Sequence, residues 1–173
     1  MRRFVSLLIL AAAACSEPAP APVPAAAPAP TPVVALDPAK GAILPAEKAQ
    51  QLSHQCSRIS PGPVTGSWAP EGATIQDLEA RLGAELEKQL APVSDAGATP
   101  QDYYRQYAGL IIGGRNIIYI NGIHANAIER DQRGTDTWKT EPAMICDGGT
   151  ITFGVEYDPA THAFANFAFN GRL

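Results

Sequence analysis

The sequence predicts an α+β fold, with an antiparallel meander of four to five strands and N-terminal helices packed on one face of the sheet. Two observations lead to this fold class. The helical patterns precede the strand patterns along the chain instead of alternating with them. Three turn signals in series then separate the later apolar runs, which is typical of consecutive hairpins. A length of 173 residues leaves room for one such domain.

Three helical segments are predicted. A short helix covers residues 46–55, after a proline suited to a first turn. A longer helix begins at Thr74, which starts a capping-box pattern, and it ends at Pro92. Thr99, followed by a proline, begins a third, short helix. The long helix carries one continuous apolar stripe that indicates a core-facing side, made by Ile75, Leu78, Leu82, Leu86 and Leu90.

The C-terminal half reads as strands. Glycine pairs at 113–114 and 148–149 fit two-residue hairpin turns, where φ must be positive. The sequence Asp-Pro-Ala-Thr at 158–161 indicates a third turn. A polar loop is expected over residues 124–136. The predicted strands cover residues 107–112, 115–123, 137–147, 150–157 and 163–170.

The first residues predict export. Arg2 and Arg3 precede an apolar run over residues 4–14 that is too short to span a bilayer. The run ends in small residues against Cys15, and this resembles the lipobox of bacterial lipoproteins, although Ala12 stands where that family prefers leucine. The resemblance implies that residues 1–14 are a signal peptide and that Cys15 receives fatty acyl chains such as palmitate. Ordinary signal cleavage, with Cys15 left as a thiol, is the alternative.

Cysteine counting favours the lipid. The chain has three cysteines, Cys15, Cys56 and Cys146, and an odd number leaves one unpaired in an exported protein. If Cys15 carries the lipid, the other two form a disulfide, which is the default in an oxidising compartment. The resemblance further implies sorting to the outer membrane, because Ser16 replaces the aspartate of inner-membrane retention. The domain is then expected to face the periplasm.

A tether and one domain are expected after the signal. Residues 15–45 are rich in proline and alanine, so helix and sheet cannot propagate there, and a polyproline-like spacer is predicted. Residues 46–173 form the single α+β domain. The predicted partners are a membrane, through the lipid, and an envelope protein or a cell-wall component.

Composition and motifs argue against several functions. The formal net charge of −4 disfavours nucleic-acid binding, which needs a basic face. The chain lacks the motifs of serine hydrolases, zinc proteases, phosphate loops and dinucleotide sites. No cofactor is expected. A metal site built on Cys56, Cys146, His54 and His124 is disfavoured because no CxxC or HxxxH pair occurs.

The candidate site residues gather around the polar loop. A charged protrusion beside an aromatic residue is a reasonable recognition tip, although a solvated loop is the simpler interpretation. No residue is assigned a catalytic role, but His124 with Asp147 or Glu156 is kept as a hydrolase alternative. The residues proposed for recognition are His124, Arg130, Arg133, Trp138, Arg115 and Tyr104.

Three stretches of the domain resemble a group of uncharacterised bacterial envelope proteins, which carries no known activity: residues 103–109, 114–119 and 146–158. Three functions are therefore carried forward. The first is a lipid-anchored envelope protein with a non-enzymatic binding or structural domain. The second is an inhibitor of a basic envelope hydrolase such as lysozyme. The third is a hydrolase that uses His124 with Asp147 or Glu156.

Overall fold

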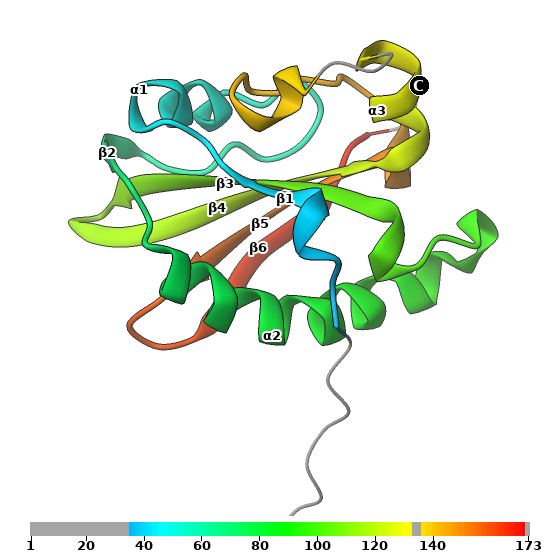
Figure 1. Cartoon of the computed structure of the whole chain (residues 1–173), viewed down its shortest axis with the longest axis horizontal. Helices are drawn as coiled ribbons and strands as arrows, with labels where there is room; N and C mark the ends of the chain where they lie inside the picture. The colour runs from blue at the N-terminus through cyan, green and yellow to red at the C-terminus, as the bar shows by residue number, and fades with distance from the viewer. Residues whose placement is uncertain (1–34, 133–135, 172–173) are drawn as a thin grey trace, which may run out of the picture. The chain divides into compact units, whose positions relative to one another are not determined.

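The computed structural model describes residues 35–132 and 136–171, which form an α+β unit around one mostly antiparallel sheet (Figure 1). The predicted class is confirmed, but the sheet has six strands instead of four to five. β1 and β2 both pair with β3, and β4, β5 and β6 follow in order. The strands are β1 Gly41–Ile43, β2 Val64–Trp68, β3 Tyr103–Ile112, β4 Arg115–His124, β5 Thr152–Asp158 and β6 Ala163–Phe169. The α-helices are α1 Ala46–Ala49, α2 Gly72–Leu90 and α3 Ala125–Gln132, and short 3₁₀ turns join them.

Two of the predicted hairpins are present. β3 and β4 pair along their whole length, and their turn is the pair Gly113 and Gly114, with φ of 57° and 75°. β5 and β6 pair across the turn at residues 159–162. The second glycine pair has positive φ but does not join two strands; it leads into the 3₁₀ turn Gly149–Ile151.

The predicted strand over residues 137–147 is wrong. This segment contains the 3₁₀ turn Thr137–Lys139 followed by irregular chain. A buried side chain of β3 replaces the hydrogen-bond ladder: the amide of Gln106 donates to the carbonyls of Trp138 and Glu141 and accepts from the backbone of Ala143. Because Gln106 satisfies these backbone groups, the segment lies over the sheet without pairing with a strand. The predicted polar loop is also different, since most of it forms α3.

The folded unit begins before residue 46. β1 lies inside the segment expected to be a tether, and it pairs in parallel with residues 105–107 of β3. β2, which is not among the predicted strands, pairs with residues 109–112. Thr99 is an N-cap and forms a capping box with Asp102, but it starts only the 3₁₀ turn Pro100–Asp102 before β3. α2 starts at Gly72, two residues before the predicted cap.

Helices cover both faces of the sheet, which corrects the expectation of one covered face. The leucine stripe of α2 packs with Tyr103, Tyr107, Ile118 and Val155. α1 and its following turn pack on the opposite face, where Ala49 and Leu52 contact Ala108, Leu110 and Tyr119. The strands β3 and β4 are apolar on both sides, and such strands need cover on both sides (Figure 1).

One charge is fully buried under α2. The side chain of Arg105 has no solvent exposure and lies 2.8 Å from Glu79 of α2. Its other hydrogen bonds reach the hydroxyl of Tyr107 and the carbonyls of Tyr103 and Asp37. Glu79 also accepts from the Tyr107 hydroxyl. This network joins the sheet, α2 and the chain that enters β1.

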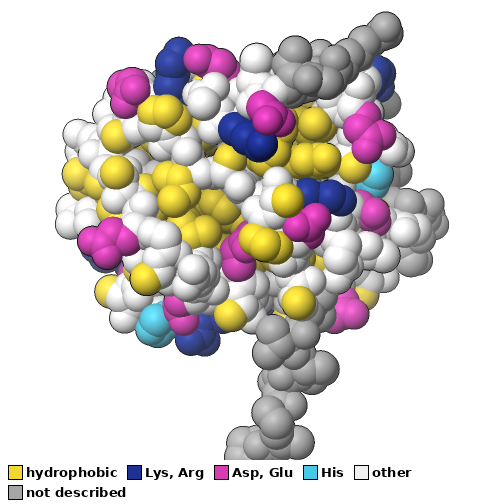
Figure 2. Space-filling view, in the orientation of Figure 1, with side chains coloured by type: hydrophobic (Ala, Val, Ile, Leu, Met, Phe, Trp, Pro, Cys, Tyr) yellow, Lys and Arg dark blue, Asp and Glu magenta, His cyan; other side chains and the backbone are white. Residues whose placement is uncertain are grey.

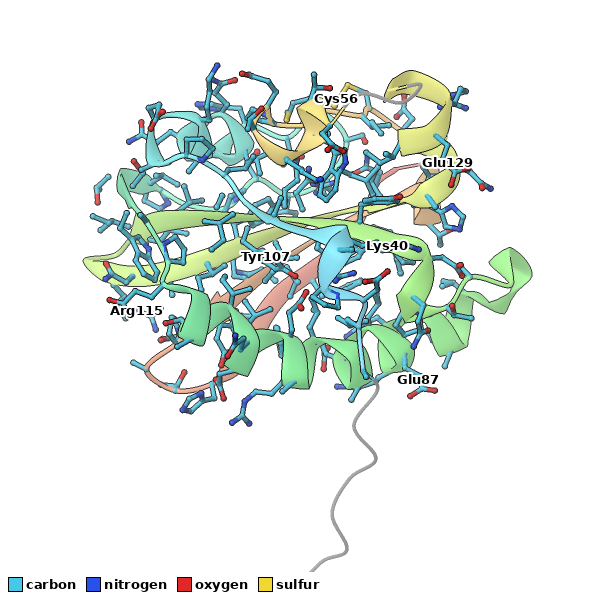
Figure 3. All side chains as sticks on the ribbon, in the orientation of Figure 1. Lys40, Cys56, Glu87, Tyr107, Arg115 and Glu129 are labelled. Carbon is cyan, nitrogen blue, oxygen red and sulfur yellow. A yellow bond between two sulfur atoms is a disulfide. The ribbon has the colours of Figure 1, made fainter. Side chains whose placement is uncertain are left out.

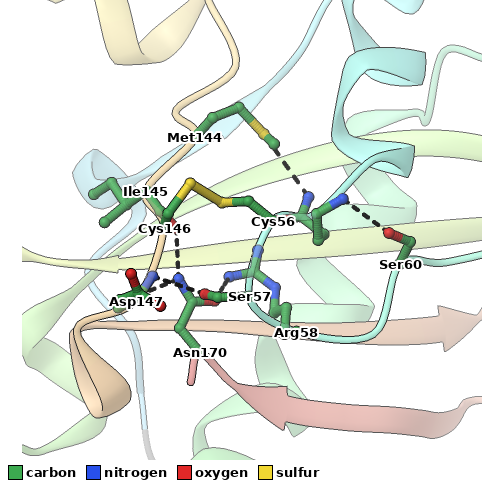
Figure 4. The surroundings of a disulfide bond; sticks show 10 residues. Cys56, Ser57, Arg58, Ser60, Met144, Ile145, Cys146, Asp147 and Asn170 are labelled. Carbon is green, nitrogen blue, oxygen red and sulfur yellow. Dashed lines mark hydrogen bonds between the residues drawn. A yellow bond between two sulfur atoms is a disulfide. The ribbon is translucent and has the colours of Figure 1, made fainter. Parts of the chain in front are cut away.

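A disulfide joins Cys56 to Cys146, as the cysteine count predicted (Figure 4). Both cysteines are exposed. Beside them, Arg58 donates to the hydroxyl of Tyr119 and to the side chains of Asn121 and Asn170. The cross-link and the Arg58 network therefore fasten two irregular segments over the same face of the sheet.

Candidate ligand-binding groove

A groove of about 800 Å³ opens at the turn end of the β3–β4 hairpin. Four segments form it: the end of β2, the start of α2, the hairpin turn and the β5–β6 turn. Figure 3 shows Arg115 at this end of the molecule. The volume of the groove is within the range of small-molecule sites. The groove, called here the hairpin-end groove, is lined by Trp68, Ala69, Glu71, Thr74, Gly114, Arg115, Asn116, Asp158, Pro159 and Ala160.

Its aromatic wall is held by the backbone of the hairpin. β2 approaches β3 closely at Gly109, where a Cβ atom would lie only 2.2 Å from the Trp68 carbonyl oxygen. The Trp68 indole nitrogen donates to the carbonyls of Leu110 and Ile117, at 3.2 and 3.3 Å. Because both contacts are to β3 and β4, the ring has a fixed place in the groove wall.

Charged side chains of both signs line the groove. Arg115 binds Asp158 through Nη1 at 2.7 Å. The second oxygen of Asp158 accepts from the backbone of Ala160 at 2.9 Å, so the turn holds this carboxylate in place. Within the described residues, the Nε and Nη2 atoms of Arg115 and the carboxylate of Glu71 make no hydrogen bond. The groove therefore offers a free donor and a free acceptor.

Glu71 lies where α2 begins. It is the N-cap residue of this helix, and its side chain makes no capping hydrogen bond. Glu71 is exposed and lines the groove.

A second polar cluster lies next to the groove, between α2 and the β5–β6 turn. One oxygen of Asp77 accepts from the Tyr157 hydroxyl at 2.5 Å and contacts His162 Nδ1 at 2.7 Å. Arg81 binds the other oxygen at 3.2 Å. The Tyr157 hydrogen bond, followed by that of Arg81, lowers the pKa of Asp77 to about 2. Burial, and then the hydrogen bond to Asp77, raises the pKa of Tyr157 to about 12.

The backbone of His162 explains what this cluster does. Its φ of 56° is in the left-handed region, which glycine adopts at no steric cost and other residues adopt with strain. The contacts with Asp77 and Tyr157 offset this strain and fix the β5–β6 turn on α2. Within the described residues, no serine, threonine or cysteine side chain bonds His162. Its contacts with Asp77 and Tyr157 position one wall of the groove.

The Asp77 cluster should be visible in acid. The folded pKa of about 2 lies below the ordinary value of 3.8, so the anion stabilises the fold above pH 4 and this contribution disappears as the pH falls towards 2. We expect the urea midpoints of the wild type and Asp77→Asn to converge over this interval. Tyr157→Phe removes the largest cause, so a carbon NMR titration should show the Asp77 carboxyl pKa moving upward. An unchanged titration would contradict this assignment.

The structure gives His124 a local role. Its Nδ1 accepts from the backbone of Asn126 at 3.2 Å, in the first turn of α3. Its ring packs edge-on against Tyr103, with centroids 5.4 Å apart. It lines a small depression of about 190 Å³. His124 therefore caps α3, which the sequence pattern did not reveal because it predicted a loop there.

The predicted recognition tip is not formed as expected. Trp138 is only 3% exposed and packs edge-on against Tyr104, with centroids 4.9 Å apart, so both aromatic rings belong to the packing of the sheet. Arg130 is exposed on α3. Arg133 lies outside the described residues. The tip is replaced by a helix whose apolar side contacts the sheet.

Arg115 is far from the other predicted residues. It pairs with Ile112 at one end of the hairpin, whereas His124 pairs with Tyr103 at the other. Nine residues separate Arg115 from His124 along β4, which corresponds to about 30 Å. Arg115 therefore does not gather with the other residues proposed for recognition, and it belongs to the hairpin-end groove.

The hydrolase arrangement is not assembled either. Glu156 pairs with Tyr119, five positions along β4 from His124, and an odd separation places the two side chains on opposite faces. Beside the disulfide, the backbone N–H of Asp147 donates to the Ser57 hydroxyl, and its backbone carbonyl accepts from the Asn170 amide. Within the described residues, neither carboxylate contacts His124.

Other site classes receive no support from the described part of the chain. In residues 35–132 and 136–171, no group of three or more histidine, cysteine, aspartate or glutamate side chains gathers as metal ligands. Among the helices described there, none is long and apolar enough to cross a membrane. On the face shown in Figure 2, lysine and arginine side chains are interspersed with acidic ones and form no single basic patch.

Sequence reasoning named Thr74 and the segment that contains Asp158, but it assigned them to a helix cap and a turn. The local signals near the groove were the turn chemistry at residues 158–161 and the glycine pair at 113–114. Contacts between segments far apart in sequence, such as Asp77 with His162, left no local signal. No family model, curated protein or solved structure matches the chain, so the geometry of these residues is what points to a function.

Proposed function

We propose that the chain is a lipid-anchored envelope protein whose folded unit is a non-enzymatic binding module, with the hairpin-end groove as its ligand site. The observation that carries this proposal is the groove itself: an opening of about 800 Å³ with fixed walls and polar groups that have no partner among the described residues. Preorganised walls favour binding because little conformational freedom is lost when a ligand enters.

The disulfide supports the anchor. It uses Cys56 and Cys146, so Cys15 is the remaining cysteine of the chain. That is the arrangement a lipid-bearing Cys15 requires. Two or more acyl chains would give stable membrane attachment, and the proline- and alanine-rich residues that follow would hold the module away from the membrane surface. The proposed location is the periplasmic side of the outer membrane.

The anchor is tested by the mass of the mature protein. We expect the full chain, expressed in a bacterium with two membranes, to be cleaved before Cys15 and to carry the added mass of fatty acyl groups. Cys15→Ser should move the protein from the membrane fraction to the soluble fraction. A mature protein without acyl mass would overturn the anchor, because plain secretion would then explain the signal sequence.

The groove is tested by NMR on the mature chain carrying Cys15→Ser. The probes are a neutral disaccharide, the dipeptide Ala-Ala and succinate. At least one probe should shift the amide signals of Gly114, Asn116 and Ala160 and leave that of Asn126 unchanged. Ala160→Trp should abolish the shifts by filling the groove, and Ala80→Trp, on the exposed side of α2, should preserve them. If none of the probes shifts the groove signals, the proposed function fails.

A further inference from the structure

We infer that the hairpin-end groove recognises a short peptide-like zwitterion, a ligand with a free ammonium group and a free carboxylate. This inference rests on the proposed function and specifies its ligand class. The inference follows from the three charged side chains that line the groove. Arg115 and Asp158 form an ion pair, and Glu71 has no partner among the described residues.

The carboxylate is assigned to Arg115. Its side chain is 66% exposed, and Asp158, 10% exposed, holds it through Nη1 alone. A guanidinium group has five N–H donors in a planar fork, so Arg115 can keep Asp158 and still bind a second carboxylate through Nε and Nη2. Because Ala160 fixes Asp158 in turn, the fork is oriented before a ligand arrives.

The ammonium group is assigned to Glu71. Glu71 is the one groove carboxylate without a partner among the described residues, since Asp158 is paired with Arg115. Trp68 lines the same groove, and an indole ring also attracts a cation. A carboxylate together with an aromatic ring is thus the pair of groups that favours an ammonium ion over a neutral group.

The other lining groups fit the middle of such a ligand. Thr74 and Asn116 offer a hydroxyl and an amide, which match the neutral hydrogen-bonding groups of a peptide bond. The second carboxylate of a dicarboxylate would be repelled by the negative charge of Glu71. The second ammonium group of a diamine would be repelled by the positive charge of Arg115. A neutral sugar would leave both charges without a partner, which costs free energy when they lose water.

The test compares Ala-Ala with its two capped forms, N-acetyl-Ala-Ala and Ala-Ala amide, by NMR titration of the mature chain carrying Cys15→Ser. Each cap removes one charge of the ligand. We expect each cap to weaken binding about tenfold, as loss of a charge-assisted hydrogen bond does.

Two variants assign the charges. Glu71→Gln should make the N-acetyl form bind as well as Ala-Ala while the amide stays weaker, and Arg115→Gln should do the reverse. Arg115→Lys keeps the charge without the fork and should lie between. Glu87→Gln, at the opposite end of α2, is the matched control and should change nothing (Figure 3). Urea unfolding of each variant separates loss of binding from loss of folding.

Each outcome has a distinct meaning. If the disaccharide or succinate shifts the groove signals while Ala-Ala and its capped forms bind alike, the zwitterion inference is wrong and the proposed function stands. If Ala-Ala binds but neither variant changes the preference for its charged ends, the assignment to Glu71 and Arg115 is wrong. If Glu71→Gln removes only the effect of the N-acetyl cap and Arg115→Gln removes only that of the amide cap, both the zwitterion inference and the assignment of the two charges are supported.

Discussion

Replacing Glu79 with alanine should lower the free energy of unfolding by about 3 to 5 kcal/mol, the usual cost of removing one partner of a buried ion pair. The remaining partner is Arg105, whose side chain has no solvent exposure. Burial by itself lowers the pKa of Arg105, and Tyr107 and Glu79 more than offset this effect, so the guanidinium stays charged in the folded protein. Without Glu79, a desolvated cation would keep only neutral acceptors.

The geometry also predicts which segments lose local stability in Glu79→Ala. Arg105 donates to the carbonyl of Asp37 at 2.6 Å and to that of Tyr103 at 2.7 Å, so it joins the entry to β1 with the start of β3. Gly41 of β1 lies against Tyr107 and Glu79, where a Cβ atom would be 3.2 to 3.3 Å from their side chains. Hydrogen exchange in Glu79→Ala should therefore increase first at β1 and along the α2 side of β3.

Urea unfolding followed by circular dichroism measures this effect. Glu79→Gln keeps an acceptor without the charge and should lose less stability than the alanine variant. Glu87→Ala, exposed on the same helix, is the control and should stay within about 0.5 kcal/mol of the wild type. If Glu79→Ala lowers the free energy of unfolding by less than about 1 kcal/mol, the ion pair contributes little. The hydrogen bond to Tyr107 would then be sufficient to stabilise the buried charge of Arg105.

Removing the disulfide should have an effect of similar size through a different mechanism. Cys56 and Cys146 are 90 positions apart, and closing a loop of that length restricts the unfolded chain by up to about 4 kcal/mol in the chain-entropy model. Both cysteines are exposed, so replacing them with serine leaves no cavity in the core. We expect the double variant to unfold at lower urea concentration while its native spectrum is unchanged.

The surroundings explain why the native fold should persist. After the sulfur bridge is lost, the hydrogen bonds of Arg58 to Asn121 and Asn170 still fasten the two irregular segments. Figure 4 shows Arg58 beside Asn170. Arg58→Ala in the disulfide-free chain should then disorder these segments, which hydrogen exchange would detect. The control is Arg58→Ala with the disulfide intact, where the loss should be smaller. If the double cysteine variant is as stable as the wild type, the unfolded chain must already be restricted without the cross-link.

The cysteine variants also bear on the anchor. The proposed lipidation of Cys15 would not depend on the other two cysteines, so the acyl mass should be unchanged in the double variant. A disulfide between Cys15 and either Cys56 or Cys146, found by peptide mapping of the native protein, would contradict both the anchor and the observed pairing.

The sequence by itself determined the α+β class, the leucine face of α2 and the Gly113–Gly114 turn. It predicted the pairing of Cys56 with Cys146 on the condition that Cys15 carries a lipid. These features follow from local periodicity, from the positive φ that glycine allows, and from the number of cysteines. Local pattern failed for β1, which is a three-residue strand in a proline-rich context and is stabilised by pairing with β3. It failed again at residues 137–147, where the distant side chain of Gln106 satisfies the backbone.

Only the tertiary structure decided where the charges meet. Arg115 and Asp158 are 43 positions apart, and Asp77 and His162 are 85 apart. Each pair comes together because the β3–β4 turn, the β5–β6 turn and the first turns of α2 lie at the same end of the strands. A side chain records its own local preference in the sequence, whereas its partner across the fold is set by strand order and register, and the hairpin-end groove is a product of that register.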